Sequence, residues 1–596
     1  MFPQTSLLLL ALAHAAPSLA SCLPPILNVP DAEWRALNET VQGRLGALRP
    51  WGEPCYQRYE AEGYSRAHAP DLTLCQIAQG HSHDAKFISS QPPAYQDPIY
   101  AVCMADGLGC PLTDLPRSNG SLHPLARTCF QGNVPDYYID VRTVSDVQAG
   151  LDFAEKHGIY VVVKNTGHDY KGRSAGRHSL AIWTHNLKPP IQLDEDFIPE
   201  ASEESVGPVI TYGAGQQFDG IYEFAHKHGY MAMGGACPTV GASGGYITGG
   251  GHSLLSPSHG LAVDNVMQMK VVLPNGTYVT ANRYQNQDIF FAVRGGGAAS
   301  FGVVTETTSR VWPEVPLQVA VISFTASLSS KEVTSILVDN GVKWGQEGWG
   351  GYLSSLGEST SLAMAITPNL SLDEARQSMK PLIDFAMPRN NGSLRFGVDV
   401  YTVDNYWEFL HTPAIQYIGG LIDGISVAQA SRLVPQENFE TEEKRTELVD
   451  ALSSMPYGIN MVPPVAYDLP ESDQKGGPGE ASVTPAWRNA IWHIMLQETW
   501  DAKDREQHTL SFFADKFRFA SQLVDPLRKI TPESGAYVNE GDTYEPDHIH
   551  SFWGWDNYSR LLKIKAEVDP SNLITCHQCV GWVPGDPRMG CYPEIL

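Results

Sequence analysis

A glycine-rich stretch surrounds one isolated cysteine near the middle of the sequence. Eight of the nineteen residues from 234 to 252 are glycine, and Cys237 stands more than a hundred residues from any other cysteine. Glycine carries a backbone-entropy cost that a protein accepts where the chain approaches a ligand closely or adopts a positive φ. Glycine clusters also form plain turns and bulges. Two further Gly-rich elements, upstream and downstream, favour a ligand cradle.

The upstream element is the loop of residues 164–174, which follows a β-branched run and carries Gly167, His168 and Ser174. Its Gly-x4-Gly-Arg-Ser pattern is close to a nucleotide P-loop, but arginine replaces the phosphate-binding lysine and strand-like sequence follows instead of a helix. We therefore expect backbone amides and Ser174 to cradle a diphosphate, with His168 as a ligand or attachment point. No Gly-x-Gly-x-x-Gly pattern with a ribose-binding acid indicates a Rossmann site.

Other reactive motifs are weaker. Cys576 and Cys579, like His548 and His550, lack partners at zinc spacing, so we expect a disulfide and no metal site. No nucleophile elbow of the Gly-x-Ser-x-Gly type stands out, which disfavours a hydrolase.

Composition sets the class of protein. A chain of 596 residues exceeds one typical core, so two domains are expected. The formal net charge of -25 argues against nucleic acid or an anionic membrane as a partner. No apolar run after the N-terminus is long enough to cross a bilayer.

The N-terminus and the cysteines predict secretion. Residues 1–20 are mostly apolar and end in a small-x-small pattern, which is typical of a signal peptide. Nine cysteines besides Cys237 predict disulfides, with the pairing open and at least one of the nine unpaired. Six Asn-x-Ser/Thr sequons also suit an extracellular glycoprotein, which we take to be monomeric.

The elements that must position these residues fall into four segments after the signal peptide. Residues 21–130 form a Cys/Pro-rich extension, and residues 131–315 a domain that opens with a strand–helix–strand unit. A second α+β domain spans 316–530, and residues 531–596 return to the first domain.

Individual elements follow from periodicity and capping. In the first domain we expect a strand over 137–141, a helix capped by Ser145, a strand over 159–163 and a hairpin about 274–276. In the second domain we expect strands at 319–324, 361–367, 394–401 and 491–497 and helices at 331–342, 372–385, 444–452 and 506–523.

Several motifs resemble those of the vanillyl-alcohol-oxidase flavoprotein superfamily, which has a PCMH-type FAD-binding domain. They are Asn165-Thr166-Gly167-His168-Asp169 with Ser174, Cys237-Pro238-Thr239-Val240-Gly241, Gly249-Gly250-Gly251, Leu261–Asn265, Arg294–Gly297, Tyr537-x-Asn539, Asn557-Tyr558 and Asp569-Pro570. The match covers roughly 130–315 and 530–585 and is similar to the berberine-bridge-enzyme-like branch, in its fungal secreted form of isoamyl-alcohol-oxidase type.

The resemblance implies a two-domain α+β flavoprotein, in which the antiparallel sheet of a helix-covered substrate domain roofs the flavin. It implies FAD bound twice covalently, through His168 and Cys237. The positions that match cofactor-binding residues of the family are Asn165, Thr166, Gly167, His168, Asp169, Ser174, Cys237, Val240, Gly241, Gly244, Gly245, Gly249, Gly250, Gly251, Val304, Asn539 and Asn557.

The family chemistry is hydride transfer from an alcohol or carbohydrate to flavin N5, with a protein base that takes the alcohol proton. Valine at position 240 is similar to members that use O2, which predicts an oxidase releasing H2O2. The family motif Tyr-x-Asn-Tyr reads Tyr537-Val538-Asn539-Glu540 here. Glu540 is therefore either the replacement base or an ion-paired carboxylate.

Further candidates lie on the strand of residues 492–497, where alternation places His493, Met495 and Gln497 on one face. Methionine transfers no proton, so His493 and Gln497 are second candidates. His252 matches a position that contacts substrate in relatives.

Two alternatives stay open. The chain is a flavin-dependent tailoring oxidase or dehydrogenase of natural products, or a redox-silent binding glycoprotein. The substrate is expected to be a small alcohol, carbohydrate or phenol.

Overall fold

The computed structural model describes most of the chain. It covers residues 24–595 apart from 63, 68, 113–116, 119, 120, 123, 124, 299, 357, 358, 391, 393, 421–423, 471–480 and 501–509. The expected signal peptide and Cys22 lie outside these residues.

A four-stranded sheet carries the His168 loop. Its order is β1 (Leu45–Ala47), β7 (Tyr137–Asp140), β9 (Ser179–Trp183), β8 (Tyr160–Lys164). The last three strands are parallel, and β1 from the N-terminal extension is antiparallel to β7. Loops after parallel strands meet at one edge of a sheet, and residues 165–174, the expected cradle, follow β8 at such an edge.

The helix α4 (Val144–His157) joins β7 to β8 and begins earlier than expected. Thr143, not Ser145, is the N-cap, in a capping box with Asp146. The Asp146 carboxylate accepts from the backbone N–H groups of Arg142 and Thr143, both at 2.9 Å, which fixes the start there. The helix ends at Gly158, whose φ is 64°.

A second sheet lies beside the first. Its order is β10 (Gln192–Asp194), β11 (Val209–Gly213), β15 (Val303–Pro313), β13 (Val266–Val272), β14 (Tyr278–Asn282), with β12 (Tyr230–Ala232) on β15. The hairpin of β13 and β14 confirms the turn expected about 274–276. The glycine-rich stretch connects β12 to β13 of this sheet and includes the short helix α6 (Ile247–Gly249).

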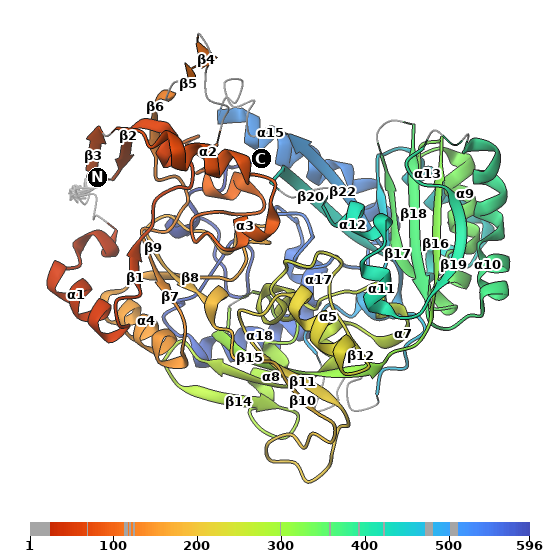
Figure 1. Ribbon diagram of the computed structural model, residues 1–596, viewed down its shortest axis with the longest axis horizontal. Coiled ribbons are helices and arrows are strands. Elements are labelled where there is room, and N and C mark those ends of the chain that lie inside the picture. The colour runs from red at the N-terminus through yellow and green to blue at the C-terminus, as the bar shows by residue number, and fades with distance from the viewer. Residues whose placement is uncertain are drawn as a thin grey trace, which may run out of the picture.

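The second domain is built on a seven-stranded antiparallel sheet. Its order is β19 (Val398–Val403), β16 (Leu317–Phe324), β18 (Ser361–Thr367), β17 (Gly350–Ser355), β21 (Gly458–Met461), β22 (Ala490–Trp500), β20 (Ser426–Pro435). One face packs against α9 (Lys331–Gln346), α10 (Leu372–Ala386) and α13 (Glu442–Ser453) in a large apolar core. Figure 1 shows these helices on the outer side of the sheet, away from the first domain.

The remaining helices cover the edges and connect the domains. They are α1 (Asp31–Thr40), α2 (Leu72–Gly80), α3 (Ala85–Ser89), α5 (Phe218–Lys227), α6 (Ile247–Gly249), α7 (Ser256–His259), α8 (Gln287–Ala292), α11 (Tyr406–Leu410), α12 (Pro413–Gly419), α14 (Ala486–Asn489), α15 (Leu510–Leu523), α16 (Asp525–Ile530), α17 (His548–Trp553) and α18 (Trp555–Val568). Within the described ranges, no helix has the length and apolar character to cross a membrane.

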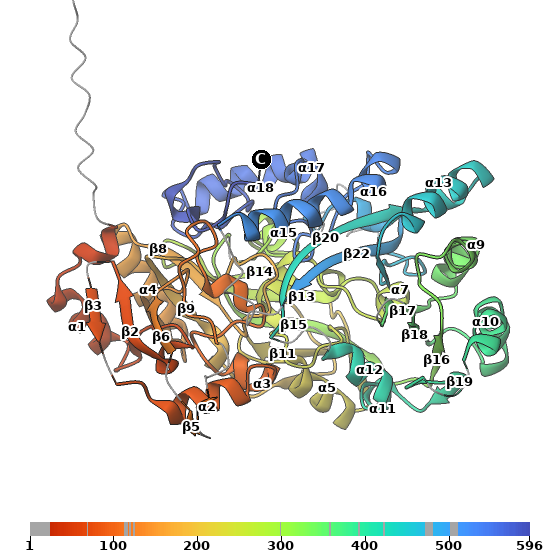
Figure 2. The same ribbon diagram turned by 90° about the horizontal axis from the view of Figure 1, so that it is seen from above.

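The two ends of the chain are tied to the first domain. The extension forms its own sheet of β3 (Tyr64–Ala67), β2 (Tyr56–Ala61) and β6 (Leu125–Phe130), beside the hairpin β4 (Arg117–Ser118) and β5 (Ser121–Leu122). The disulfides are Cys55–Cys75, Cys103–Cys591, Cys110–Cys129 and Cys576–Cys579. Figure 2 shows the C-terminal helices running along one side of both domains.

Candidate active site

A cavity of about 440 Å³ lies where the two domains meet. The His168 loop and the glycine-rich stretch line one part of it, and the inner face of the seven-stranded sheet lines another. Chain segments far apart in sequence therefore converge on one space. Its size suits a small-molecule site.

His168 and Cys237 meet at the wall of this cavity. Their Nε2 and Sγ atoms lie 3.9 Å apart. The Thr239 hydroxyl lies between them, 2.8 Å from His168 Nε2 and 3.3 Å from Cys237 Sγ. Burial lowers the pKa of His168 to about 4, so its imidazole is neutral and has a lone pair available for bond formation. The two predicted attachment points are thus adjacent.

The polar side chains of the His168 loop offer unused hydrogen-bonding atoms. Buried Asn165 Oδ1 and Ser174 Oγ have no hydrogen-bond partner among the described residues, whereas Arg173 Nε lies 3.6 Å from Asp169 Oδ1 in an ion pair. All three residues line the cavity. Asp169 shapes the loop by accepting from the backbone N–H of Ser174 at 2.6 Å. Buried polar atoms are normally paired, so these atoms fit a polar ligand that supplies the missing partners.

The predicted cofactor-binding residues divide by position. Those that line the cavity are Asn165, Thr166, Gly167, His168, Asp169, Ser174, Cys237, Val240, Gly241, Gly245 and Asn539. Gly244 lies beside Asn165, and a Cβ on Gly249 would come within 2.4 Å of the Asn539 side chain, so both pack behind the wall.

Other predicted cofactor-binding positions lie farther back. Gly250 and Gly251 have φ of 130° and 70°, where glycine is favoured, and form the turn before His252. Val304 lies within β15, and Asn557 donates to the Val483 carbonyl at 3.0 Å. Neither residue lines the cavity, and their cofactor roles stay predictions.

Glu540 joins two histidines from two other segments. Its carboxylate lies 3.0 Å from His252 Nε2 and 2.8 Å from His493 Nε2. His252 follows the glycine-rich stretch, His493 lies on β22, and Glu540 sits in an irregular turn of the returning segment. We call these three residues the His–Glu–His cluster. Glu540 and His252 line the cavity, whereas His493 is fully buried behind them.

Electrostatics keep the carboxylate of this cluster ionised. Burial alone would raise the pKa of Glu540, but the two histidines outweigh it and hold that pKa well below its usual range. Burial lowers the pKa of His493, against the opposing pull of Glu540. The carboxylate is therefore ionised and His493 neutral at ordinary pH. Since the groups are strongly coupled, a proton taken up belongs to the cluster as a unit.

The same three groups have the ligand types of a transition-metal site. A histidine bound to metal through Nε2 normally donates its Nδ1–H to an acceptor. Neither His252 Nδ1 nor His493 Nδ1 has a hydrogen-bond partner within the described part of the chain. A His493 Nδ1 without an acceptor fits an imidazole that burial keeps neutral and that donates through Nε2–H. We therefore interpret the cluster as hydrogen-bonded acid–base groups.

Tyr537 and Gln497 lie in the cavity wall, where their polar groups form hydrogen bonds with other residues of the protein. The Tyr537 hydroxyl accepts from the Gly251 N–H at 3.2 Å and from Asn539 Nδ2 at 2.7 Å. Burial raises the pKa of Tyr537, so the phenol stays protonated. Gln497 donates to Gln429 Oε1 at 2.7 Å. Gln429 in turn donates to the Glu540 carbonyl at 3.0 Å.

Several contributors have no predicted role in the sequence analysis. Thr239 bridges His168 and Cys237, Arg173 donates to Asn539 Oδ1 at 2.8 Å, and Gln429 holds the Glu540 backbone. Thr239 lies in the Cys237 motif, two residues after Cys237, so the motif itself could have indicated it. No motif could have indicated Gln429, because its role depends on the register that places it opposite Gln497 in β20 and β22.

Comparison with known proteins identifies the family. Residues 135–282 match the family described as FAD binding domain, and residues 536–581 match berberine and berberine like. The chain is 32% identical to FAD-linked oxidoreductase ffsJ of Aspergillus flavipes, over 97% of this chain and 94% of that one. It is 29% identical to FAD-linked oxidoreductase OXR2 of Pyricularia oryzae, over 95% of each.

Solved structures agree. The VAO-type flavoprotein MtVAO615 of Myceliophthora thermophila C1 superimposes with a TM-score of 0.76 at 25% identity, over 93% of this chain and 95% of that one. The buried, unpaired polar atoms of the His168 loop fit the FAD that this fold binds. The expected VAO/PCMH-type α+β fold is confirmed. The chain belongs to the FAD-linked oxidoreductases of the vanillyl-alcohol-oxidase superfamily, in its berberine-bridge-enzyme-like branch.

Proposed function

We propose that this protein is a secreted oxidase with bicovalently bound FAD, which oxidises an alcohol or carbohydrate C–OH group and passes the electrons to O2 to give H2O2. The observation that carries the proposal is one cavity that contains both the adjacent His168 and Cys237 and the ionised Glu540. A redox-silent binding protein has no need of either feature. Secretion and a monomeric state are part of the proposal and rest on sequence alone.

Bound FAD supplies the acceptor for a hydride. His168 and Cys237 would hold it at the two attachment points, while Asn165 and Ser174 would pair with its polar groups. The Glu540 carboxylate, whose side chain is 16% exposed, orients the substrate hydroxyl and takes its proton. His252 and His493 donate to the carboxylate and share the proton. Tyr537 and Asn539 hold the backbone of the cavity wall in place.

The direct test follows flavin absorbance and peroxide together. The purified protein is mixed in air with alcohols, mono- and oligosaccharides and phenols. Flavin bleaching that recovers with H2O2 release is the expected result. Bleached flavin that does not recover in air would mean a dehydrogenase and overturn the inference from Val240. Protein without flavin would contradict the whole proposal.

A second candidate, a tailoring oxidase or dehydrogenase of natural products, keeps the flavin but acts on another class of substrate. Apolar groups in the cavity wall favour it, since Met495 and Ile418 both line the cavity. The same assay separates the two by which substrate class bleaches the flavin.

The rate of flavin reduction should not depend on pH across the neutral range. Glu540 must be ionised, and since its pKa lies below the ordinary 4.5 it stays ionised above that value. We expect a flat rate from about pH 5 to pH 8 and a fall only at lower pH. Anaerobic stopped-flow reduction across this range measures it. A rate that climbs toward about pH 10 would instead indicate a tyrosine base.

Metal removal should leave the reaction unchanged. Because the cluster is interpreted as hydrogen-bonded, dialysis against a chelator should alter neither flavin content nor the reduction rate. Elemental analysis before and after dialysis accompanies the kinetics. Stoichiometric zinc or iron whose loss abolishes reduction would show that His252, His493 and Glu540 ligate a metal.

A further inference from the structure

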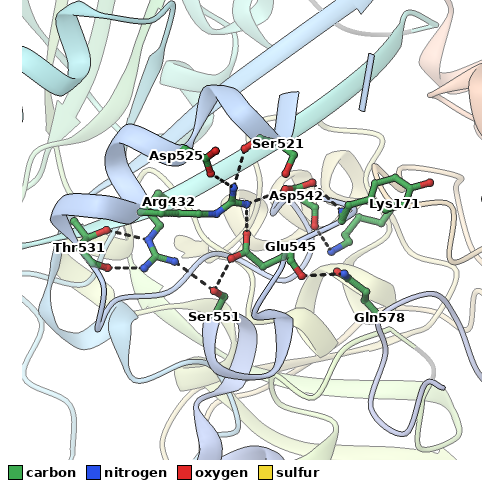
Figure 3. Close-up of polar contacts among 11 residues, drawn as sticks. Lys171, Arg432, Ser521, Asp525, Thr531, Asp542, Glu545, Ser551 and Gln578 are labelled. Carbon is green, nitrogen blue, oxygen red and sulfur yellow. Dashed lines mark hydrogen bonds and ion pairs between the residues drawn. The ribbon is translucent and has the colours of Figure 1, made fainter. Parts of the chain in front are cut away.

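Buried charged side chains gather around Asp542 and Glu545, which follow Glu540 by two and five residues in the sequence (Figure 3). Arg528 Nη2 donates to Asp542 Oδ2 at 2.8 Å and to Glu545 Oε2 at 2.5 Å. Arg432 reaches the same group through Ser551, whose hydroxyl donates to Glu545 Oε1 at 2.8 Å. We call these five residues the Arg528 cluster. None of them lines the cavity of the candidate active site.

Neighbouring segments hold the backbone between Asp542 and Glu545. Lys171, three residues after His168, donates to the Asp542 carbonyl at 3.0 Å. Gln578 donates to the Glu545 carbonyl, also at 3.0 Å. Arg528 and Arg432 belong to the second domain, so the cluster joins that domain, the His168 loop and the returning segment at one point.

This buried arrangement is weak evidence of a gain in stability. The Asp542 and Glu545 side chains are 1% and 3% exposed, and Arg432 is 4% exposed. Removing charges from water costs several kcal/mol per ion, and well-packed apolar residues often stabilise a fold as well or better. Buried ion pairs can instead select one conformation, and here the selected conformation is that of the turn.

Glu540 depends on its turn for its position. The turn has no strand or helix ladder, and its carboxylate must meet His252 from the first domain and His493 from the second. Only Gly541 separates Glu540 from Asp542. A Cβ on Gly541 would come within 2.5 Å of the Phe552 ring, so this link is closely packed.

We infer that Arg528 is a positioning residue for Glu540: by holding Asp542 and Glu545 together, it places the Glu540 carboxylate between His252 and His493. The inference rests on the proposed function only where Glu540 is taken as the proton acceptor. The placement of the Glu540 carboxylate by Arg528 does not depend on which reaction the protein catalyses.

The test is Arg528→Lys in the full-length flavin-loaded protein. Lysine keeps the charge but lacks the planar fork that donates to two carboxylates at once. In the crystal structure of the variant, we expect the 2.8 Å contact of Glu540 with His493 to be lost while His168 and Cys237 stay in place. Flavin reduction should slow about 10²-fold, the usual cost of a misplacement near 1 Å. Arg588→Lys, in an ion pair with Asp586 on the same returning segment, is the matched control and should change neither readout.

A double-mutant cycle shows whether Arg528 acts through Glu540. In a Glu540→Gln background, Arg528→Lys should have little further effect on the reduction rate. An equal slowing in both backgrounds would mean a general structural role and overturn the inference. So would an unchanged contact between Glu540 and His493 in the crystal.

Two further results keep the inference separate from the proposed function. If the flavin of the Glu540→Gln variant is reduced at the wild-type rate, Glu540 is not the proton acceptor. The contact between Glu540 and His493 in the crystal structure of Arg528→Lys then decides the positioning role. If Arg528→Lys does not fold, Glu545→Gln replaces it, because the amide keeps the shape of the carboxylate. The same crystal contact, lost or kept, then supports or overturns the inference.

Discussion

Glu540→Gln is expected to slow flavin reduction about 10²–10⁴-fold, the usual contribution of a positioned acid–base group. The amide has the shape of the carboxylate but is not basic, so it takes no proton. Binding of FAD should be unaffected, because His168 and Cys237 are unchanged. Rapid mixing with substrate under anaerobic conditions gives the rate, and the ratio of flavin to protein absorbance gives the cofactor content.

Glu533→Gln is the control for this variant. Glu533 is an exposed carboxylate on the same returning segment, outside the cavity of the candidate active site. Its substitution should leave the rate and the flavin content unchanged. A Glu540→Gln enzyme that reduces flavin within a few-fold of the wild-type rate would return Glu540 to the role of a plain ion-paired carboxylate. His252 would then be the next candidate.

The second large effect is expected when His168 and Cys237 are both replaced: the protein should then release its flavin. Wild-type protein should stay yellow after acid denaturation, and so should His168→Ala and Cys237→Ala singly, since one covalent bond suffices to retain the flavin. Only the double variant should release it. The measurement is flavin absorbance in the precipitate and supernatant after denaturation.

Peptide mapping checks the same claim without denaturation. One flavin bonded to His168 and Cys237 should join the two peptides that contain them into a single species with flavin absorbance. Thr239→Val is the control, since it removes the bridging hydroxyl and leaves both attachment points. Release of flavin by His168→Ala alone would show that Cys237 forms no bond.

Periodicity was sufficient for much of the fold. The strand expected over 361–367 appears as β18 with the same bounds, and the expected helices at 331–342 and 372–385 appear as α9 and α10, each extended at its end. The strand expected from 394 begins instead at Val398, where β19 meets its partner Ile322 on β16. A strand needs a partner to pair with, and sequence pattern does not give that partner.

The site was predictable in part for a related reason. His168 and Cys237 stand out because each lies in glycine-rich sequence, and family resemblance links them. Glu540 could be found but not assigned, since its role depends on histidines that are 288 and 47 residues away in sequence. Packing of two domains brings these groups together. The Arg528 cluster has the same origin, because its members come from both domains.

Both ends of the chain complete the His168 loop. The Tyr100 hydroxyl donates to the Tyr170 carbonyl and the Tyr592 hydroxyl to the Lys171 carbonyl, each at 2.6 Å. The disulfide Cys103–Cys591 fastens these two regions across a sequence separation of 488. We therefore expect the loop to gain its full support only after residues 591 and 592 have been synthesised and the disulfide has formed. Covalent attachment of the flavin, as proposed above, would then follow translation of this segment, and deletion of residues 591–596 would remove both Cys591 and Tyr592 from the support of the loop.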